Sequence, residues 1–287
     1  MDNKKSFIIF LVLITFLCGC TDGIDVKESD PTSFSAGTVP NMDGTILESS
    51  EPSESVQPLF SEPDLSLPME PGSYLLKYSG ENTSDYLDYY LFIPKNAKID
   101  MPLIVFLHGD GEVGKIDRLE NYGLIASARE IYGEEFPFIV ISPCTRIYSW
   151  TEGSIPETLI GLINETIDLC SADPDRIILT GHSRGAMGVW YFISNYGDYF
   201  AAAVPVSCGT DAALNYDMCK QVPVLAMAGT SGDMEIQFQE EMRRIVRKLT
   251  EAGGIAELIL LSDCEHKDTS KTAYTEETFR WMLEKKR

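Results

Sequence analysis

The sequence has few positive charges and few histidines. Its 287 residues include 23 Lys and Arg against 44 Asp and Glu, a formal net charge of −21, and only three His. Nucleic-acid binding requires clustered Lys and Arg against the phosphates, so this balance argues against a nucleic-acid partner. The sequence also has no Cys-x-x-Cys pair and no Cys/His cluster at zinc spacing, so it predicts no metal site.

Cysteines are few and odd in number beyond the first twenty residues. Five remain there: Cys144, Cys170, Cys208, Cys219 and Cys264. At most two disulfides are possible, and the pair at 208 and 219 would close the shortest loop. Buried free thiols are the simpler alternative.

The first twenty residues have the pattern of an export signal. Lys4 and Lys5 precede an apolar run from Phe7 to Leu17, which is too short to span a bilayer but has the length of a signal-peptide core. The run ends in Leu17-Cys18-Gly19-Cys20, which resembles the lipobox of bacterial lipoproteins. The resemblance implies a signal peptide over residues 1–19, a lipid on Cys20 and a protein exported to the outer face of the cytoplasmic membrane. A plain secretory signal or a short membrane anchor is the alternative.

Residues 20–73 differ in composition from the rest of the chain. Positions 21 to 73 contain ten Ser, seven Pro and eleven acidic residues against a single lysine, Lys27. Such a segment buries too little apolar surface to offset its ordering entropy. We therefore expect a disordered, self-repelling stalk between the lipid and a folded domain. A partner-binding tail is the alternative.

The remainder, residues 74–287, alternates strand and helix patterns and contains no internal repeat. The expected strands are 86–93, 103–107, 138–141, 176–180, 201–206, 223–228 and 257–261, and the expected helices are 119–132, 156–170, 184–195, 237–252 and one that ends near residue 286. Strands separated by such helices predict an α/β domain with a mostly parallel sheet and helices on both faces. The first strand ends at Pro94, and we expect it in an antiparallel hairpin.

One motif suggests a nucleophile. Gly181-His182-Ser183-Arg184-Gly185 fits G-x-S-x-G and lies between an expected strand and an expected helix, the setting of a nucleophile elbow. The two glycines permit the sharp turn that raises the Ser183 hydroxyl above the sheet. An ordinary glycine-rich turn is the alternative.

A serine hydroxyl needs a neighbouring base, and three histidines limit the choice. The side chain of His182 should point away from the hydroxyl on a tight elbow, so His266, after the last strand, is the expected base. Chain order then requires an acid between 184 and 265 at a strand end. Asp233 is the expected acid, and a helix cap is its alternative role. Reserve candidates in the same interval are Asp211, Asp217 and Glu235.

Two backbone N–H groups are needed to hold an oxyanion. One should come from Arg184, the residue after the nucleophile, and the other from Asp110 or Gly111 in the turn after the strand at 103–107. In the same turn, His108 is expected to order the loop rather than titrate, with substrate contact as the alternative. The aromatic residues Tyr148, Trp150 and Trp281 are candidates for the substrate cleft, with core or surface packing as the alternative.

These residues together resemble an α/β-hydrolase. The resemblance rests on Leu107-His108-Gly109, the Asp175–Gly185 segment, Trp190, Phe200–Val206, the Gly229–Asp233 turn and His266. They are similar to secreted esterases of the feruloyl esterase, acetyl xylan esterase and polyhydroxybutyrate depolymerase type, and to prolyl-oligopeptidase-like predicted peptidases. The acid turn of that family usually reads Gly-x-x-Asp, and here it is one residue longer.

The resemblance implies a serine esterase with a Ser-His-Asp triad and no metal or organic cofactor. We also expect a monomer. Its substrates would be small or polysaccharide-linked esters, for instance acyl or feruloyl decorations. Arg184, beside the nucleophile, suggests a preference for anionic or polar substrates. The alternatives are a serine peptidase on the same machinery and a non-catalytic surface-binding lipoprotein.

Overall fold

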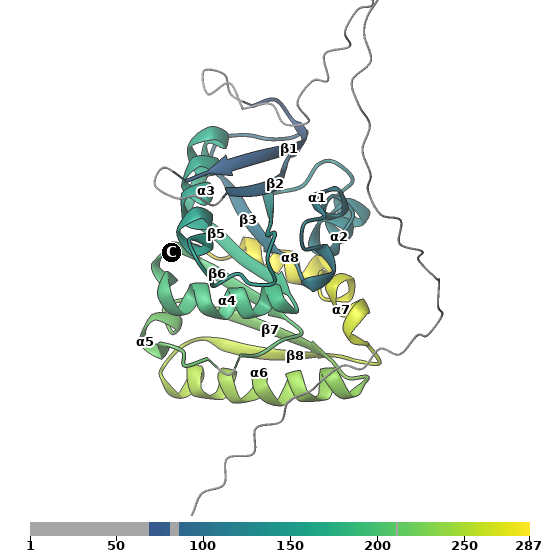
Figure 1. Cartoon of the computed structure of the whole chain (residues 1–287), viewed down its shortest axis with the longest axis vertical. Coiled ribbons are helices and arrows are strands. Elements are labelled where there is room, and N and C mark those ends of the chain that lie inside the picture. Colours follow the sequence, from purple (N-terminus) through teal and green to yellow (C-terminus); the bar gives the residue numbers. More distant parts are fainter. Residues whose placement is uncertain (1–68, 81–85, 211) are drawn as a thin grey trace, which may run out of the picture. The chain divides into compact units, whose positions relative to one another are not determined.

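A computed structural model describes residues 69–80, 86–210 and 212–287 (Figure 1). The signal peptide, Cys20 and nearly all of the stalk predicted from the sequence lie outside these residues, as does Asp211. The first strand begins at Gly72, two residues before the expected start of the domain. No helix within the described ranges is both long and apolar enough to cross a membrane.

Eight strands form a single sheet in the order β1-β2-β4-β3-β5-β6-β7-β8. Their bounds are β1 Gly72–Ser79, β2 Tyr86–Ile93, β3 Met101–Leu107, β4 Ile139–Cys144, β5 Ala172–His182, β6 Ala202–Val206, β7 Val224–Gly229 and β8 Ala256–Leu261. The strand β2 pairs antiparallel with β1 and β4, and every other pairing is parallel. The carboxyl ends of β3 to β8 therefore meet at one edge of the sheet.

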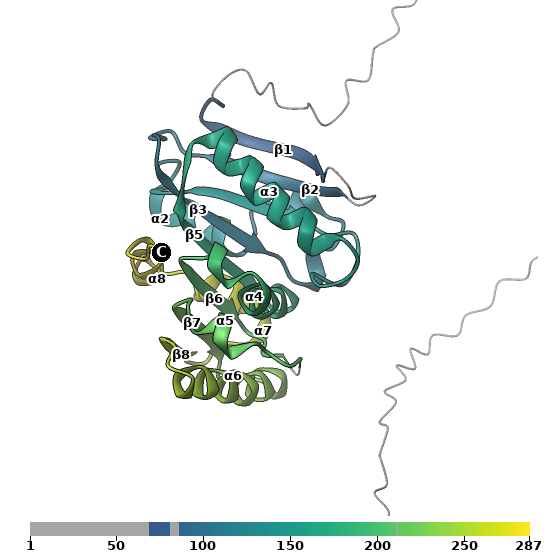
Figure 2. The ribbon, with the colours of Figure 1, turned by 90° about the vertical axis from the view of Figure 1, so that its left-hand side faces the viewer.

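Helices cover both faces of this sheet. Their bounds are α1 Ile116–Leu119, α2 Gly123–Tyr132, α3 Ile155–Cys170, α4 Arg184–Asn195, α5 Tyr216–Cys219, α6 Asp233–Glu251, α7 His266–Thr272 and α8 Glu276–Leu283. Figure 2 looks onto the face that α3 and α4 cover, with α2 on the opposite side. Buried side chains of α3, α4 and α6 form one core and those of α1, α2 and α8 form the other.

The central strands read as continuous apolar runs because both of their faces are buried. In β3, Leu103, Val105 and Leu107 enter the core under α3 and α4. The alternate residues Ile104 and Phe106 enter the core under α2 and α8. The predicted α/β architecture, the antiparallel hairpin and the helices on both faces are confirmed.

Three helix expectations need adjustment. The helix expected over 119–132 is two helices, and α2 begins at Gly123 with a φ of +54°, where a Cβ would lie 2.4 Å from the Phe106 ring. The terminal helix is likewise two, α7 and α8. The helix α6 begins at residue 233 rather than 237, so Asp233 and Glu235 both lie within it. All five cysteines of the described chain are free thiols.

Candidate active site

Ser183 occupies a strained turn between β5 and α4. Its φ is +56° and its ψ is −119°, a combination that non-glycine residues seldom adopt. The motif glycines make the turn possible, because a Cβ on Gly185 would lie 2.0 Å from the Leu107 carbonyl oxygen. A Cβ on Gly181 would lie 2.6 Å from the carbonyl carbon of residue 185. The sequence motif is therefore a genuine elbow with the serine at its tip.

His266 lies beside Ser183. It is the first residue of α7, after β8, and its Nε2 is 2.9 Å from the Ser183 Oγ. Since the other ring nitrogen faces a carboxylate, Nδ1 carries the proton and Nε2 accepts from the serine hydroxyl. The structure therefore brings together the nucleophile and the base that the sequence predicts.

The acid that faces His266 is Glu235. Its Oε1 accepts from the His266 Nδ1 at 2.6 Å. Its Oε2 accepts from the backbone N–H of Gly229 at 2.6 Å and from the Ser207 hydroxyl at 3.1 Å. The side chain is 0% exposed. Both oxygens are used, so the carboxylate is held rigidly against the imidazole.

The prediction that Asp233 is the acid beside His266 is therefore wrong. Asp233 is the first residue of α6 and is exposed, which is a favourable place for a carboxylate at a helix N-terminus. Positions two residues apart on a helix point in nearly opposite directions, so Asp233 faces solvent when Glu235 faces the core. Of the other reserve acids, Asp217 is exposed and pairs with Lys220 at 2.7 Å.

The helical pattern of the sequence favours Glu235 over Asp233. The inward stripe of α6 contains Met242, Ile245 and Leu249. Seven residues before Met242, on the same face of the helix, comes Glu235. A carboxylate on a buried helical stripe, close to a strand end, is a stronger acid candidate than one in the turn.

The two segments expected to supply oxyanion donors meet in the structure. Arg184 begins α4 and Asp110 begins a short 3₁₀ helix, Asp110–Glu112, so neither backbone N–H has a partner within its own helix. Their side chains form a bidentate ion pair in which the Arg184 Nε and Nη2 donate to the two Asp110 oxygens, the latter at 2.9 Å. Gly109 lies against the elbow, since a Cβ there would be 3.4 Å from the Ser183 Cβ. Gly111 has no described atom within 4 Å of an added Cβ.

The structure places His108 in a supporting role. It is buried, its Nδ1 donates to the Gly109 carbonyl at 2.6 Å, and its Nε2 accepts from the Thr145 N–H at 3.1 Å. Burial lowers the pKa of His108 to about 4, so the ring is neutral near pH 7. These contacts fix the turn that carries Asp110. They agree with the expectation that His108 orders the loop, and its buried ring gives no support to the alternative of substrate contact.

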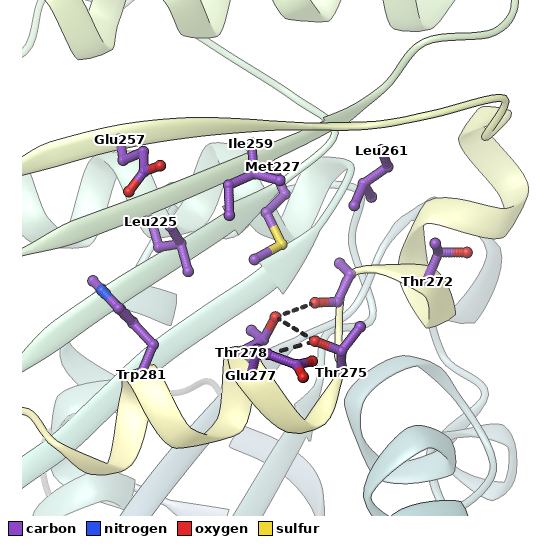
Figure 3. A pocket seen from close by; sticks show the side chains of 11 residues that line it. Leu225, Met227, Glu257, Ile259, Leu261, Thr272, Thr275, Glu277, Thr278 and Trp281 are labelled. Carbon is purple, nitrogen blue, oxygen red and sulfur yellow. Dashed lines mark hydrogen bonds between the residues drawn. The ribbon is translucent and has the colours of Figure 1, made fainter.

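Two of the three aromatic candidates are also corrected. Trp150 is 2% exposed, and its Nε1 donates to the His108 carbonyl at 3.1 Å, so it supports the same turn from within the core. Trp281 lies in α8 and lines a separate apolar pocket of about 280 Å³ against Leu225 and Ile259 (Figure 3). Ser183, His266 and Glu235 are absent from the lining of that pocket. Tyr148 is 64% exposed and remains compatible with substrate contact.

Two aromatic rings and a serine complete the surroundings of His266 and Glu235, and the sequence pointed to neither Phe238 nor Ser207. Its ring packs against Phe238 of α6, with centroids 5.4 Å apart, and against His182, with centroids 4.9 Å apart. Ser207, which donates to Glu235, has a φ of +56° directly after β6. Within the described residues, no group of three or more His, Cys, Asp and Glu side chains is arranged to hold a metal ion.

This sheet order and elbow are those of the α/β-hydrolase fold, and solved structures agree. The chain is similar to a thermostable esterase, with 26% identity, a TM-score of 0.66, and coverage of 75% of this chain and 63% of that one. It is also similar to a mutant of the feruloyl esterase module from Clostridium thermocellum complexed with sinapinate, with 14% identity, a TM-score of 0.60, and coverage of 78% and 93%.

A third similar structure is the poly(3-hydroxybutyrate) depolymerase from Bordetella parapertussis, with 13% identity, a TM-score of 0.52, and coverage of 74% and 94%. No family model matches the sequence, and no curated protein matches it. The matched region covers less than two thirds of the length of the thermostable esterase. It has the α/β-hydrolase fold.

Proposed function

We propose that this protein is a serine hydrolase that cleaves carboxylic esters through an acyl-enzyme. The observation that carries the proposal is the unbroken relay from the Ser183 Oγ to the His266 Nε2, at 2.9 Å, and from the His266 Nδ1 to Glu235, at 2.6 Å. A serine is a weak nucleophile unless an oriented base accepts its proton. The strained elbow and the buried carboxylate supply that orientation.

The reaction follows from this relay. The Ser183 oxygen forms a bond to the ester carbonyl carbon while its proton moves to the His266 Nε2. The N–H groups of Arg184 and Asp110 stabilise the resulting oxyanion. The carbon–oxygen bond to the alcohol then breaks, and the alcohol leaves with the proton from His266. Water attacks the acyl-enzyme with the same base, and the acid product leaves.

The substrate class proposed is an ester linked to a small molecule or a polysaccharide, with acyl or feruloyl groups as the first candidates. Similarity in fold to a feruloyl esterase module and to a thermostable esterase supports this choice. The test measures the turnover of matched aryl esters and aryl amides by the full-length protein. The acyl part and the alcohol part of the esters are varied separately. Ester turnover at least about 100-fold above amide turnover is expected, and comparable rates would instead favour a serine peptidase.

A location outside the cell is a second part of the proposal and rests on residues 1–20. The short apolar run and the Leu17–Cys20 segment support export and lipid attachment at Cys20. Metabolic labelling with a radioactive fatty acid in a bacterial host tests this. Label is expected on the wild-type chain and not on Cys20→Ser, with Cys18→Ser as the matched control. Equal labelling of both variants would contradict a lipid on Cys20.

A further inference from the structure

His182 is the residue before the nucleophile, yet its side chain lies against the base. It is the last residue of β5 and is only 5% exposed. Because alternate residues of a strand point to opposite sides, its ring leaves the elbow on the side away from the Ser183 hydroxyl. There it meets α7, where His266 begins the helix.

The hydrogen bonds of His182 define one tautomer. Its Nε2 is 3.1 Å from the backbone carbonyl oxygen of His266. A carbonyl only accepts, so Nε2 carries a proton and donates. Its Nδ1 is 2.7 Å from the Tyr122 hydroxyl, which donates to it. Burial raises the pKa of Tyr122 and keeps that hydroxyl protonated.

The ring is neutral as well as fixed. Burial, and then the nearby His266, lower the pKa of His182 to about 3. A neutral ring matters here because the His266 ring lies 4.9 Å away and becomes positively charged when it accepts the serine proton. A second positive charge at that distance would oppose the transfer.

Thr269 connects the same atoms. Its hydroxyl is 3.1 Å from the His182 Nε2 and donates to the His266 carbonyl at 2.8 Å. The carbonyl of His266 is therefore held by one donor from β5 and by one donor from its own helix. The donor from β5 is the side chain of His182, which directly precedes Ser183. The hydrogen bond therefore couples the position of His266 to the elbow.

We propose that His182 is a positioning residue, which holds the backbone of His266 through the Nε2–H to carbonyl hydrogen bond and so sets the base against Ser183. This inference rests on the proposed hydrolase function. It explains why a polar imidazole, that of His182, is buried here although it is not part of the relay from Ser183 to Glu235. It also assigns a role to Tyr122, whose hydroxyl donates to Nδ1 and so supports the tautomer that the His266 carbonyl requires.

The test separates the donor from the ring. His182→Phe keeps a ring of similar size and loses both nitrogens, whereas His182→Gln loses the ring and keeps an N–H donor. A base displaced by about 1 Å can cost about 100-fold in rate. We expect His182→Phe to lower kcat for an aryl acetate about 10- to 100-fold with KM within twofold, and His182→Gln to recover most of the loss. Packing alone would give the reverse order.

Tyr122→Phe provides a variant that keeps the aromatic packing if His182→Phe fails to fold. Without the Tyr122 hydroxyl, the His182 Nδ1 can take the proton. The His182 Nε2 would then face the His266 carbonyl without a hydrogen, and we expect kcat to fall about two- to fivefold. A loss of kcat in His182→Gln with wild-type kcat in His182→Phe would overturn the proposal in favour of packing, and equal losses in the two variants would overturn it as well. If His182→Phe does not fold, an unchanged kcat in Tyr122→Phe overturns the proposal. If the wild-type protein turns over no ester and reacts with no fluorophosphonate, the proposed function fails instead.

Discussion

His266 donates its Nδ1 proton to Glu235 and not to Asp233, two residues earlier on the same helix. The Nδ1 to Oε1 distance is 2.6 Å, and the carboxylate is completely buried. Asp233 stands exposed at the first position of α6. Both residues belong to α6, and the acid is its third residue rather than its first. We therefore describe the relay as Ser-His-Glu.

Substitution of each acid by its amide distinguishes the roles of Glu235 and Asp233. Glu235→Gln keeps the size of the side chain but offers the imidazole a neutral amide, which neither fixes the tautomer nor stabilises the charged ring. Loss of a triad carboxylate in this way costs on the order of 10⁴-fold in kcat in other serine hydrolases, and we expect about 10³- to 10⁴-fold here. Asp233→Asn is the matched control and should stay within twofold. Steady-state hydrolysis of an aryl acetate measures both, and the opposite ranking would return Asp233 to the relay.

The glycines of the elbow differ sharply from the nearby glycine of the oxyanion turn. A Cβ on Gly185 meets the Leu107 carbonyl at 2.0 Å, whereas a Cβ on Gly111 meets nothing within 4 Å among the described atoms. Overpacking of this kind costs about 1–3 kcal/mol or more. Gly185→Ala should therefore lower the free energy of unfolding by at least this amount, and Gly111→Ala should change it by less than about 0.5 kcal/mol. Urea unfolding followed by circular dichroism gives both values, and equal stability of the two variants would contradict the contact.

The ion pair between Arg184 and Asp110 joins the two segments that would supply the oxyanion donors in the proposed reaction. Each side chain is more than a third exposed, and exposed pairs contribute about 0.2–1 kcal/mol. We expect Arg184→Ala and Asp110→Ala each to lower kcat about two- to fivefold, and the double variant to lose no more than either alone. Strictly multiplicative losses would indicate that the pair does not couple the segments.

The same pair bears on substrate charge. The Arg184 guanidinium already has a carboxylate partner, so the preference for anionic substrates suggested by its sequence position loses its physical basis. Arg184→Ala should leave the ratio of rates for matched anionic and neutral esters within twofold of wild type. A fall of the anionic rate alone would show that the guanidinium contacts the substrate.

Buried neutral histidines predict a loss of stability in mild acid. The pKa values of His108 and His182 fall to about 4 and about 3 from the ordinary 6.5, chiefly through burial. Below about pH 6.5 the unfolded chain binds protons that the folded protein excludes, so stability is full above that pH and falls as the pH drops towards 4. Each imidazole contributes up to about 1.4 kcal/mol per pH unit. Urea midpoints between pH 7 and pH 5 should decline, and His108→Gln should decline less steeply, whereas identical slopes would argue against a buried neutral His108.

The fold was predictable from the sequence because its signals are local. The continuous apolar run of β3 reflects a strand buried on both faces, and the glycine spacing around Ser183 reflects close contact with Leu107. The limits of single elements were harder. A break such as that before Gly123 depends on a contact with Phe106 across the core, and the local pattern carries no information about it.

The site was predictable as far as chain order and residue type reach. Three histidines and one elbow leave few choices for the nucleophile and the base. The turn motif could not identify the acid, because the direction of each acidic side chain depends on where α6 begins. Gly232, with a φ of +89°, sets that start. The roles of His108 and His182 depend on buried hydrogen bonds that form only when distant segments meet.

The relay is tested most directly by the reaction of the full-length protein with a fluorophosphonate, followed by intact mass and peptide mapping. The relay predicts one stoichiometric adduct on Ser183, absent in Ser183→Ala, with a second-order rate that falls at least about 100-fold in Glu235→Gln and is unchanged in Asp233→Asn. An unmodified Ser183 in a folded wild-type protein, or equal rates in the wild type and Glu235→Gln, would contradict the Ser183–His266–Glu235 relay.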